Sequence, residues 1–139
     1  MLSKKLLETI PKSIRTIRKL TSETLTESLT FQQMRILILI NEGQSQSQMA
    51  ETLQVSHAAI SKMISFLTKK KLVLCNAGND RRTHVLYVTP KSKVILKKAV
   101  NYVCSKLDVG INELSKDEKE QLMKGLLILD RVMTKVKEV

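Results

Sequence analysis

The feature that most constrains the fold of this chain is a pair of capped helices joined by a very short turn. Ser45 and Gln48 form an S-x-x-Q capping box, which predicts a helix over residues 46–53. Ser56 caps a second helix, expected from His57 to about Lys70. Because so few residues separate them, the second helix must turn sharply against the first, as in a helix-turn-helix.

Two short strands and a polar loop are expected after the second helix. Residues 72–75 and 84–88 are apolar and partly β-branched, and the loop between them is rich in Gly and Asn. Asp80, Arg81 and Arg82 lie at the tip of this hairpin. A helix-turn-helix followed by an arginine-tipped hairpin is typical of winged-helix DNA readers. In these proteins a helix enters the major groove, and the hairpin presents cations to the minor groove or the backbone.

The N-terminal residues predict a helix with one apolar stripe. Pro11 suits the first turn of a helix, so residues 1–9 are interpreted as a separate lead-in arm, and the helix is expected to reach about Ser28. The stripe at helical spacing consists of Leu6, Ile10, Ile14, Ile17 and Leu20.

The strongly apolar segment of residues 31–41 has two interpretations. Its Ile/Leu run fits a buried strand, but Phe31, Met34 and Leu37 follow helical spacing and Gly43 provides a helix end. We therefore predict a core helix.

Two more helices are expected after the hairpin. Thr89 is a suitable N-cap, and the proline that follows it fits the first position of a helix running over residues 90–108, which Gly110 would close. Ser115 and Glu118 form another capping box, which begins the last helix.

The last helix carries a heptad-like apolar seam. Such a seam is common in ordinary core packing and in helix pairing. This helix extends well beyond a small winged-helix lobe, so we expect a second subunit to cover its apolar face. The seam consists of Leu122, Leu126, Leu129, Met133 and Val136.

The length of 139 residues predicts one structural domain overall. The expected fold is mainly α with a small β-hairpin: a winged helix-turn-helix with long N- and C-terminal dimerisation helices. Residues 1–30 would form the arm and the N-terminal dimerisation helix, residues 31–89 the DNA-binding lobe, and residues 90–139 the C-terminal dimerisation helices.

The cellular location is expected to be cytoplasmic, without membrane association. No apolar run reaches the roughly 18 residues of a membrane span. The N-terminus lacks the apolar segment of a signal peptide. The two cysteines form no disulfide framework, which fits a reducing compartment.

The net charge of +11 is concentrated on the helix-plus-hairpin segment. Residues 57–100 contain ten Lys or Arg and one acid, whereas residues 101–139 contain seven of each sign. A phosphate-binding surface requires such a concentration of positive charge.

Several motifs in this order resemble the MarR family of transcriptional regulators. They are Leu29-Thr30-Phe31-Gln32-Gln33, Ser45-Gln46-Ser47-Gln48-Met49-Ala50, Val55-Ser56-His57-Ala58-Ala59-Ile60-Ser61-Lys62, and Asp80-Arg81-Arg82 followed by Val88-Thr89. The resemblance covers about residues 29–92 closely. It departs at Lys71, where the family usually has Gly, and in a wing about one residue short.

The resemblance implies a homodimer that binds a pseudo-palindromic operator in double-stranded DNA, most often as a repressor. It also allows a small-molecule effector between the dimerisation helices and the DNA lobes, although no residue here indicates a particular one.

The candidate DNA-binding residues lie on the second helix and the hairpin. Short hydroxyls near the helix start can reach base edges, and lysines can reach phosphates or guanine. Ser56 is interpreted equally well as a plain cap or as a DNA contact. Arg82 is the candidate for minor-groove insertion, with Asp80 holding its guanidinium. The full set is Ser56, His57, Ser61, Lys62, Ser65, Lys69, Lys70, Asp80, Arg81 and Arg82.

Other chemistries have little support in the sequence. His57, His84 and Cys75 lack the spacing of a metal site. Cys104 is interpreted as a buried small hydrophobic residue and Cys75 as a strand residue. No catalytic set or phosphate loop is found, so we expect neither an enzyme nor a cofactor. The alternatives that stay open are a winged-helix protein-interaction module and a non-specific architectural DNA binder.

Overall fold

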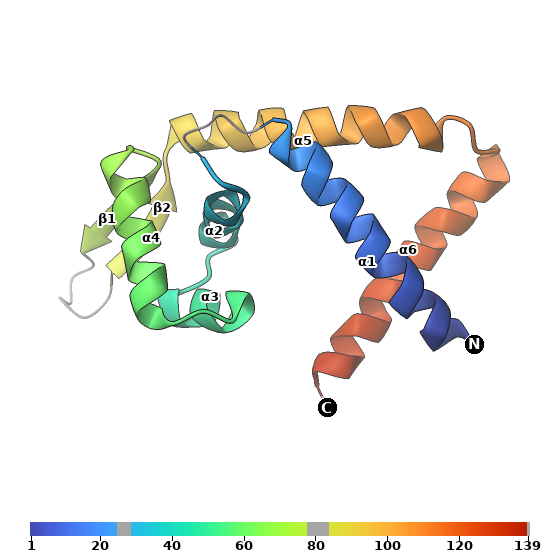
Figure 1. The fold of residues 1–139 in the computed structure, drawn as a ribbon, viewed down its shortest axis with the longest axis horizontal. Coiled ribbons are helices and arrows are strands. Elements are labelled where there is room, and N and C mark those ends of the chain that lie inside the picture. The colour runs from blue at the N-terminus through green and yellow to red at the C-terminus, as the bar shows by residue number, and fades with distance from the viewer. Residues whose placement is uncertain (25–28, 78–83, 139) are drawn as a thin grey trace. The chain divides into compact units, whose positions relative to one another are not determined.

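The computed structural model describes residues 1–24, 29–77 and 84–138 (Figure 1). The described residues form six helices and one two-stranded antiparallel sheet. In chain order the elements are α1 (Leu2–Ser22), α2 (Phe31–Asn41), α3 (Gln46–Leu53), α4 (His57–Lys69), β1 (Val73–Ala77), β2 (His84–Val88), α5 (Pro90–Ile111) and α6 (Lys116–Lys137). The predicted fold class, a mainly helical winged helix-turn-helix, is confirmed.

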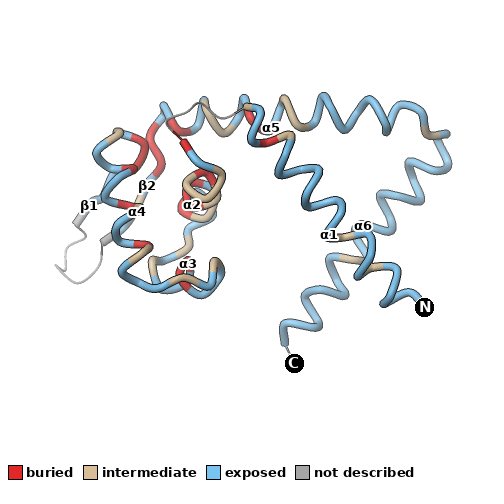
Figure 2. Tube along the Cα trace, viewed as in Figure 1, coloured by how far each residue is buried: buried red, intermediate tan, exposed pale blue. Residues whose placement is uncertain are grey.

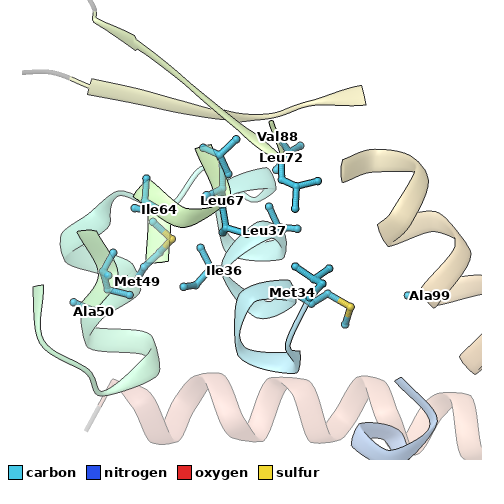
Figure 3. Close-up of a cluster of buried hydrophobic side chains, with 14 residues drawn as sticks. Met34, Ile36, Leu37, Met49, Ala50, Ile64, Leu67, Leu72, Val88 and Ala99 are labelled. Atoms are coloured by element: carbon cyan, nitrogen blue, oxygen red, sulfur yellow. The ribbon is translucent and has the colours of Figure 1, made fainter. Parts of the chain in front are cut away.

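Buried side chains gather where α2, α3, α4 and the hairpin meet (Figure 2). Ile36, Leu37, Met49 and Leu67 are fully buried in this cluster, which is aliphatic and methionine-containing (Figure 3). The segment that was open between strand and helix is the helix α2. It supplies four buried residues, because a helix turns an unbroken apolar run toward several neighbours at once.

Capping boxes fix the starts of three helices. Ser45 accepts from the Gln48 N–H at 3.2 Å, while Gln48 Oε1 accepts from the Ser45 N–H at 2.8 Å. Thr30 with Gln33, and Ser115 with Glu118, make the same reciprocal pair. The boxes predicted at α3 and α6 are confirmed, and the box at α2 was not predicted.

Three helices of the lobe end in the same hydrogen-bonded motif. After α4, the N–H of Leu72 donates to Leu67 O at 2.9 Å, and the next residue back bonds one turn earlier in the same way. Equivalent pairs of bonds close α2 and α3, so all three ends are Schellman motifs. The residues in the left-handed position are Gly43 (φ 84°), Gln54 (φ 54°) and Lys71 (φ 59°).

The hairpin presents one face to the core and the other to solvent. Val73 opposes Val88, and both are buried. The adjacent pair, Leu74 and Tyr87, is exposed on the other face because side chains alternate along a strand.

A buried polar cluster joins the base of the hairpin to α5. The Thr89 hydroxyl donates to Lys71 O at 2.8 Å and accepts from the Ser92 N–H at 3.3 Å. The Ser92 hydroxyl donates to Leu72 O, and its side chain is fully buried. The predicted N-cap at Thr89 thus also carries the connection between α4, the hairpin and α5.

The N-terminal helix corrects two sequence predictions. Helix α1 runs unbroken from Leu2 to Ser22, with Pro11 inside it, so no separate arm is formed by residues 1–9. The strong helix formers on both sides of the proline outweigh the hydrogen bond that it removes. The helix also ends at Ser22, earlier than predicted, and residues 25–28 lie outside the described part of the chain.

Helix α5 and the cysteines give two further corrections. Gly110 lies within α5 and does not close it, because the helix continues to Ile111. Cys104 is exposed in this single chain, contrary to the buried position expected, and Cys75 is exposed on β1.

The chain separates into two compact units, Met1–Val103 and Cys104–Val139. In the first unit, the hydroxyl of Tyr102 donates to Glu23 Oε2 at 2.6 Å, linking α5 to the end of α1. This bond, with smaller contributions from desolvation and the carboxylate charge, raises the pKa of the Tyr102 phenol above its ordinary value. None of the described helices is both long and apolar enough to cross a membrane.

Candidate nucleic-acid interface

Helix α4 has sharply different faces. Ile60, Ile64 and Leu67 are buried against the lobe, as predicted. The opposite side is solvent-exposed over an arc of roughly 140° and carries only polar or small side chains. The predicted DNA-facing residues on this exposed side are His57, Ser61, Lys62, Ser65 and Lys69.

The position of α4 is fixed by the turn before it. Gln54 adopts the left-handed conformation after α3, and the N–H of Val55 returns to Ala50 O at 3.0 Å. The extended backbone at Ser56 then starts α4 (φ −70°, ψ 155°). This tight reversal sets the crossing of the two helices, with no loop to loosen it.

The structure assigns a capping role to Ser56. Its hydroxyl oxygen accepts from the Ala59 N–H at 3.1 Å, which satisfies one of the unpaired N–H groups at the start of α4. The hydroxyl is exposed, so it can cap the helix and still lie at the protein surface.

Ser61 makes a contact that sequence reasoning missed. Its hydroxyl donates to Oε1 of Gln46, the first residue of α3, at 3.4 Å. The two residues are fifteen positions apart in the sequence. Their only sequence signal is that each is a small or amide side chain near the start of one helix of the helix-turn-helix.

The lysines near the end of α4 differ in their surroundings. Lys62 and Lys69 are exposed, whereas Lys70 is half-buried with its ammonium 4.5 Å from the centre of the Phe66 ring. A cation over an aromatic face is held by the ring quadrupole, so Lys70 is directed more narrowly than a solvated lysine. Helix α4 itself contains no acidic residue.

The body of the hairpin is described, but its tip is not. Strands β1 and β2 pair from Val73 and Val88 outward to Ala77 and His84. The predicted wing residues Asp80, Arg81 and Arg82 lie outside the described residues, so their roles stay predictions.

A crevice of about 200 Å³ lies between the α2–α3 turn and β2. It is smaller than the roughly 300–1,000 Å³ of typical ligand pockets. Its lining residues are Gly43, Gln44, Ser45, Gln46, Val85 and Leu86. Within the described ranges, no three His, Cys, Asp or Glu side chains are grouped as a metal site.

Solved structures share this arrangement over nearly the full chain. The transcriptional regulator Tm0710 from Thermotoga maritima has a TM-score of 0.77 at 17% identity, covering 98% of this chain and 99% of its own. A mutant of MarR from E. coli has a TM-score of 0.71 at 20% identity, covering 96% of each chain. The chain has the MarR fold.

A third protein with the MarR fold is FabT from Streptococcus pneumoniae, whose structure is a complex with DNA. It has a TM-score of 0.72 at 18% identity, covering 96% of each chain. No protein-family model and no curated protein matches the sequence. The similarity therefore lies in the fold, and the function is argued below from the residues.

Proposed function

We propose that this protein is a sequence-specific DNA-binding transcription regulator that acts as a homodimer, as a repressor, on a pseudo-palindromic operator. The observation that carries the proposal is the exposed face of α4, which combines short hydroxyls with lysines and contains no acid. A major groove about 12 Å wide admits one α-helix, and such side chains suit base edges and phosphates. The DNA complex of FabT, which has the same fold, supports this proposal.

Each candidate residue has a role that follows from its chemistry. Ser61 and Ser65 meet base edges, and Lys62 reaches guanine or a phosphate. The lysines at positions 69 and 70 add attraction that does not depend on sequence. Arg82 enters the minor groove with Asp80 fixing its direction, and Arg81 meets the backbone. A bound operator would be closed to the transcription machinery.

The dimer is proposed from apolar faces that a single chain leaves uncovered. No residue of α6 is buried within the described structure, and the seam residues Leu126 and Val136 are 53% and 64% exposed. Exposed apolar area of this extent marks an interaction surface. Two chains that pair their end helices would cover it and place two lobes on the two half-sites. An effector acting between the helices and the lobes would alter that spacing.

The test of this function is selection of duplexes from random DNA, followed by titration of the selected duplex, a random duplex and an acidic protein. We expect one pseudo-palindromic sequence to bind at least about 10³-fold more tightly than random DNA. Equal affinity for both duplexes would establish the architectural alternative, and preference for the acidic protein the interaction-module alternative.

Salt dependence provides a second test. If each dimer neutralises six to ten phosphates, affinity should fall by roughly 10³–10⁵ between 50 and 200 mM salt. A flat response, measured by fluorescence anisotropy, would contradict DNA binding through the basic face of α4.

Lys62→Ala separates base reading from general attraction. Loss of a base contact should cost about 1–3 kcal/mol at one base pair of the operator and little elsewhere. Lys69→Ala should weaken binding to all duplexes alike and reduce the salt slope by about one. Equal effects of Lys62→Ala on every single-base operator variant would make Lys62 a phosphate contact instead.

A further inference from the structure

The contact between Gln46 and Ser61 connects the two helices of the helix-turn-helix at the surface proposed to meet DNA. The Ser61 hydroxyl points from the exposed face of α4 to the carbonyl oxygen of the Gln46 amide, at 3.4 Å. The Gln46 backbone is held by the capping box of Ser45 and Gln48, which fixes the first turn of α3. Gln46 is half-buried and Ser61 is exposed, so Ser61 can be reached by a ligand while Gln46 stays partly enclosed.

A serine hydroxyl has one hydrogen to donate and two lone pairs that accept. An unconstrained serine therefore contacts amino and keto bases equally well. When the hydrogen of Ser61 is donated to Gln46, only lone pairs are presented to the DNA. In the major groove these accept from the amino groups of adenine N6 and cytosine N4, whereas guanine O6 and thymine O4 offer no donor.

From this geometry, and resting on the proposed function, we infer that Gln46 is a positioning residue that sets the base preference of Ser61. By taking the hydroxyl hydrogen, Gln46 makes Ser61 an acceptor that selects adenine or cytosine over guanine or thymine on the contacted strand. The opposite orientation of the amide would donate to Ser61 and free its hydrogen for keto bases. The two orientations therefore predict opposite preferences.

The amide nitrogen of Gln46 gives the contact a second use. Among the described residues, no hydrogen bond from Gln46 Nε2 is found, so its two N–H groups can donate to a DNA phosphate while Oε1 holds Ser61. One side chain would then couple the docking of α3 on the backbone to the base contact of α4.

The experiment measures the affinity of the full-length protein for the selected operator and for variants with each base pair at each position. The variants are Ser61→Ala, Gln46→Met, Gln46→Glu and the control Gln44→Met. Gln44 lies two residues away and accepts from the Thr52 hydroxyl instead, at 3.1 Å. Circular dichroism and thermal unfolding identify any variant that fails to fold.

We expect the wild type to prefer an amino base at one position of each half-site by roughly 3–10-fold, the effect of one hydrogen bond. Ser61→Ala and Gln46→Met should both remove this preference at the same position. Gln46→Glu, whose carboxylate is only an acceptor, should keep it while lowering affinity for every duplex. Gln44→Met should leave it unchanged.

Three results would overturn the inference while leaving the proposed function intact. They are a wild-type preference for a keto base, full preference in Gln46→Met, and preferences unaffected by Ser61→Ala. Failure of the proposed function is distinct, because it shows as a wild-type protein that binds all duplexes equally. That result would overturn both.

Discussion

At the scale of single residues, the three Schellman ends show how the lobe uses left-handed backbone. Only one of the three positions is glycine, and Gln54 and Lys71 adopt the same conformation with a Cβ atom. An L-residue in this region costs roughly 1–2 kcal/mol. The tight turn of the helix-turn-helix is therefore held at a local cost that the core below it must offset.

Gly43→Ala tests this cost directly. A Cβ at this position meets nothing within 4 Å, so backbone strain is the only expected effect. The free energy of unfolding should fall by about 1 kcal/mol. Gly110→Ala is the matched control, since this glycine lies inside α5 with equally open space, and there the change should stabilise by up to about 1 kcal/mol. Urea unfolding followed by circular dichroism measures both, and changes of the same sign would refute the explanation.

The sequence was sufficient to assign the exposed residues of α4 but not their contacts. Helical periodicity determines which side is buried, so Ile60 and Ile64 indicate where Ser61 and Lys62 must face. The bond from Ser61 to Gln46 depends on how closely α3 and α4 cross, which no periodicity encodes. For Ser56 the structure shows the cap, one of two interpretations that the sequence left equal.

At the scale of elements, the buried hydroxyls at the base of the hairpin hold α4, β1 and α5 together. Ser92→Ala would leave the carbonyl of Leu72 without this donor in a fully buried site. We expect a loss of about 1–3 kcal/mol of unfolding free energy. The control is Ser13→Ala on α1, where an exposed hydroxyl donates to Thr9 O at 3.0 Å and removal should change stability by less than about 0.5 kcal/mol. Similar small effects at both positions would show that the buried cluster carries little stability.

Element boundaries were predictable wherever a local signal fixes them. Capping boxes predicted the starts of α3 and α6 to the residue, because the side chain and backbone pair within one turn. Pro11 and Gly110 misled for the opposite reason. Each disfavours a helix locally, yet α1 and α5 continue through them because the neighbouring residues favour helix on both sides.

At the scale of the whole molecule, the central question is what covers the apolar end helices. The lobe buries its own core, whereas α6 buries nothing within the described chain. Sequence periodicity predicted the seam but could not distinguish burial within one chain from burial between two, since both require the same heptad spacing. The exposure of the seam in a single chain favours the second.

Leu126→Asp should therefore disrupt the proposed dimer. A charge placed in an apolar interface must be desolvated without a partner, so sedimentation or light scattering should show the mass halved, or the chain aggregated. Because an obligate dimer gains stability with protein concentration, the unfolding temperature of the wild type should rise with concentration, and that of the variant should not. Lys124→Asp is the matched control, an exposed position of α6 outside the seam. Its mass and its concentration dependence should equal those of the wild type. A wild-type monomer whose unfolding temperature is independent of concentration would show that the end helices are not paired between chains, and operator binding by two lobes of one dimer would then have to be abandoned.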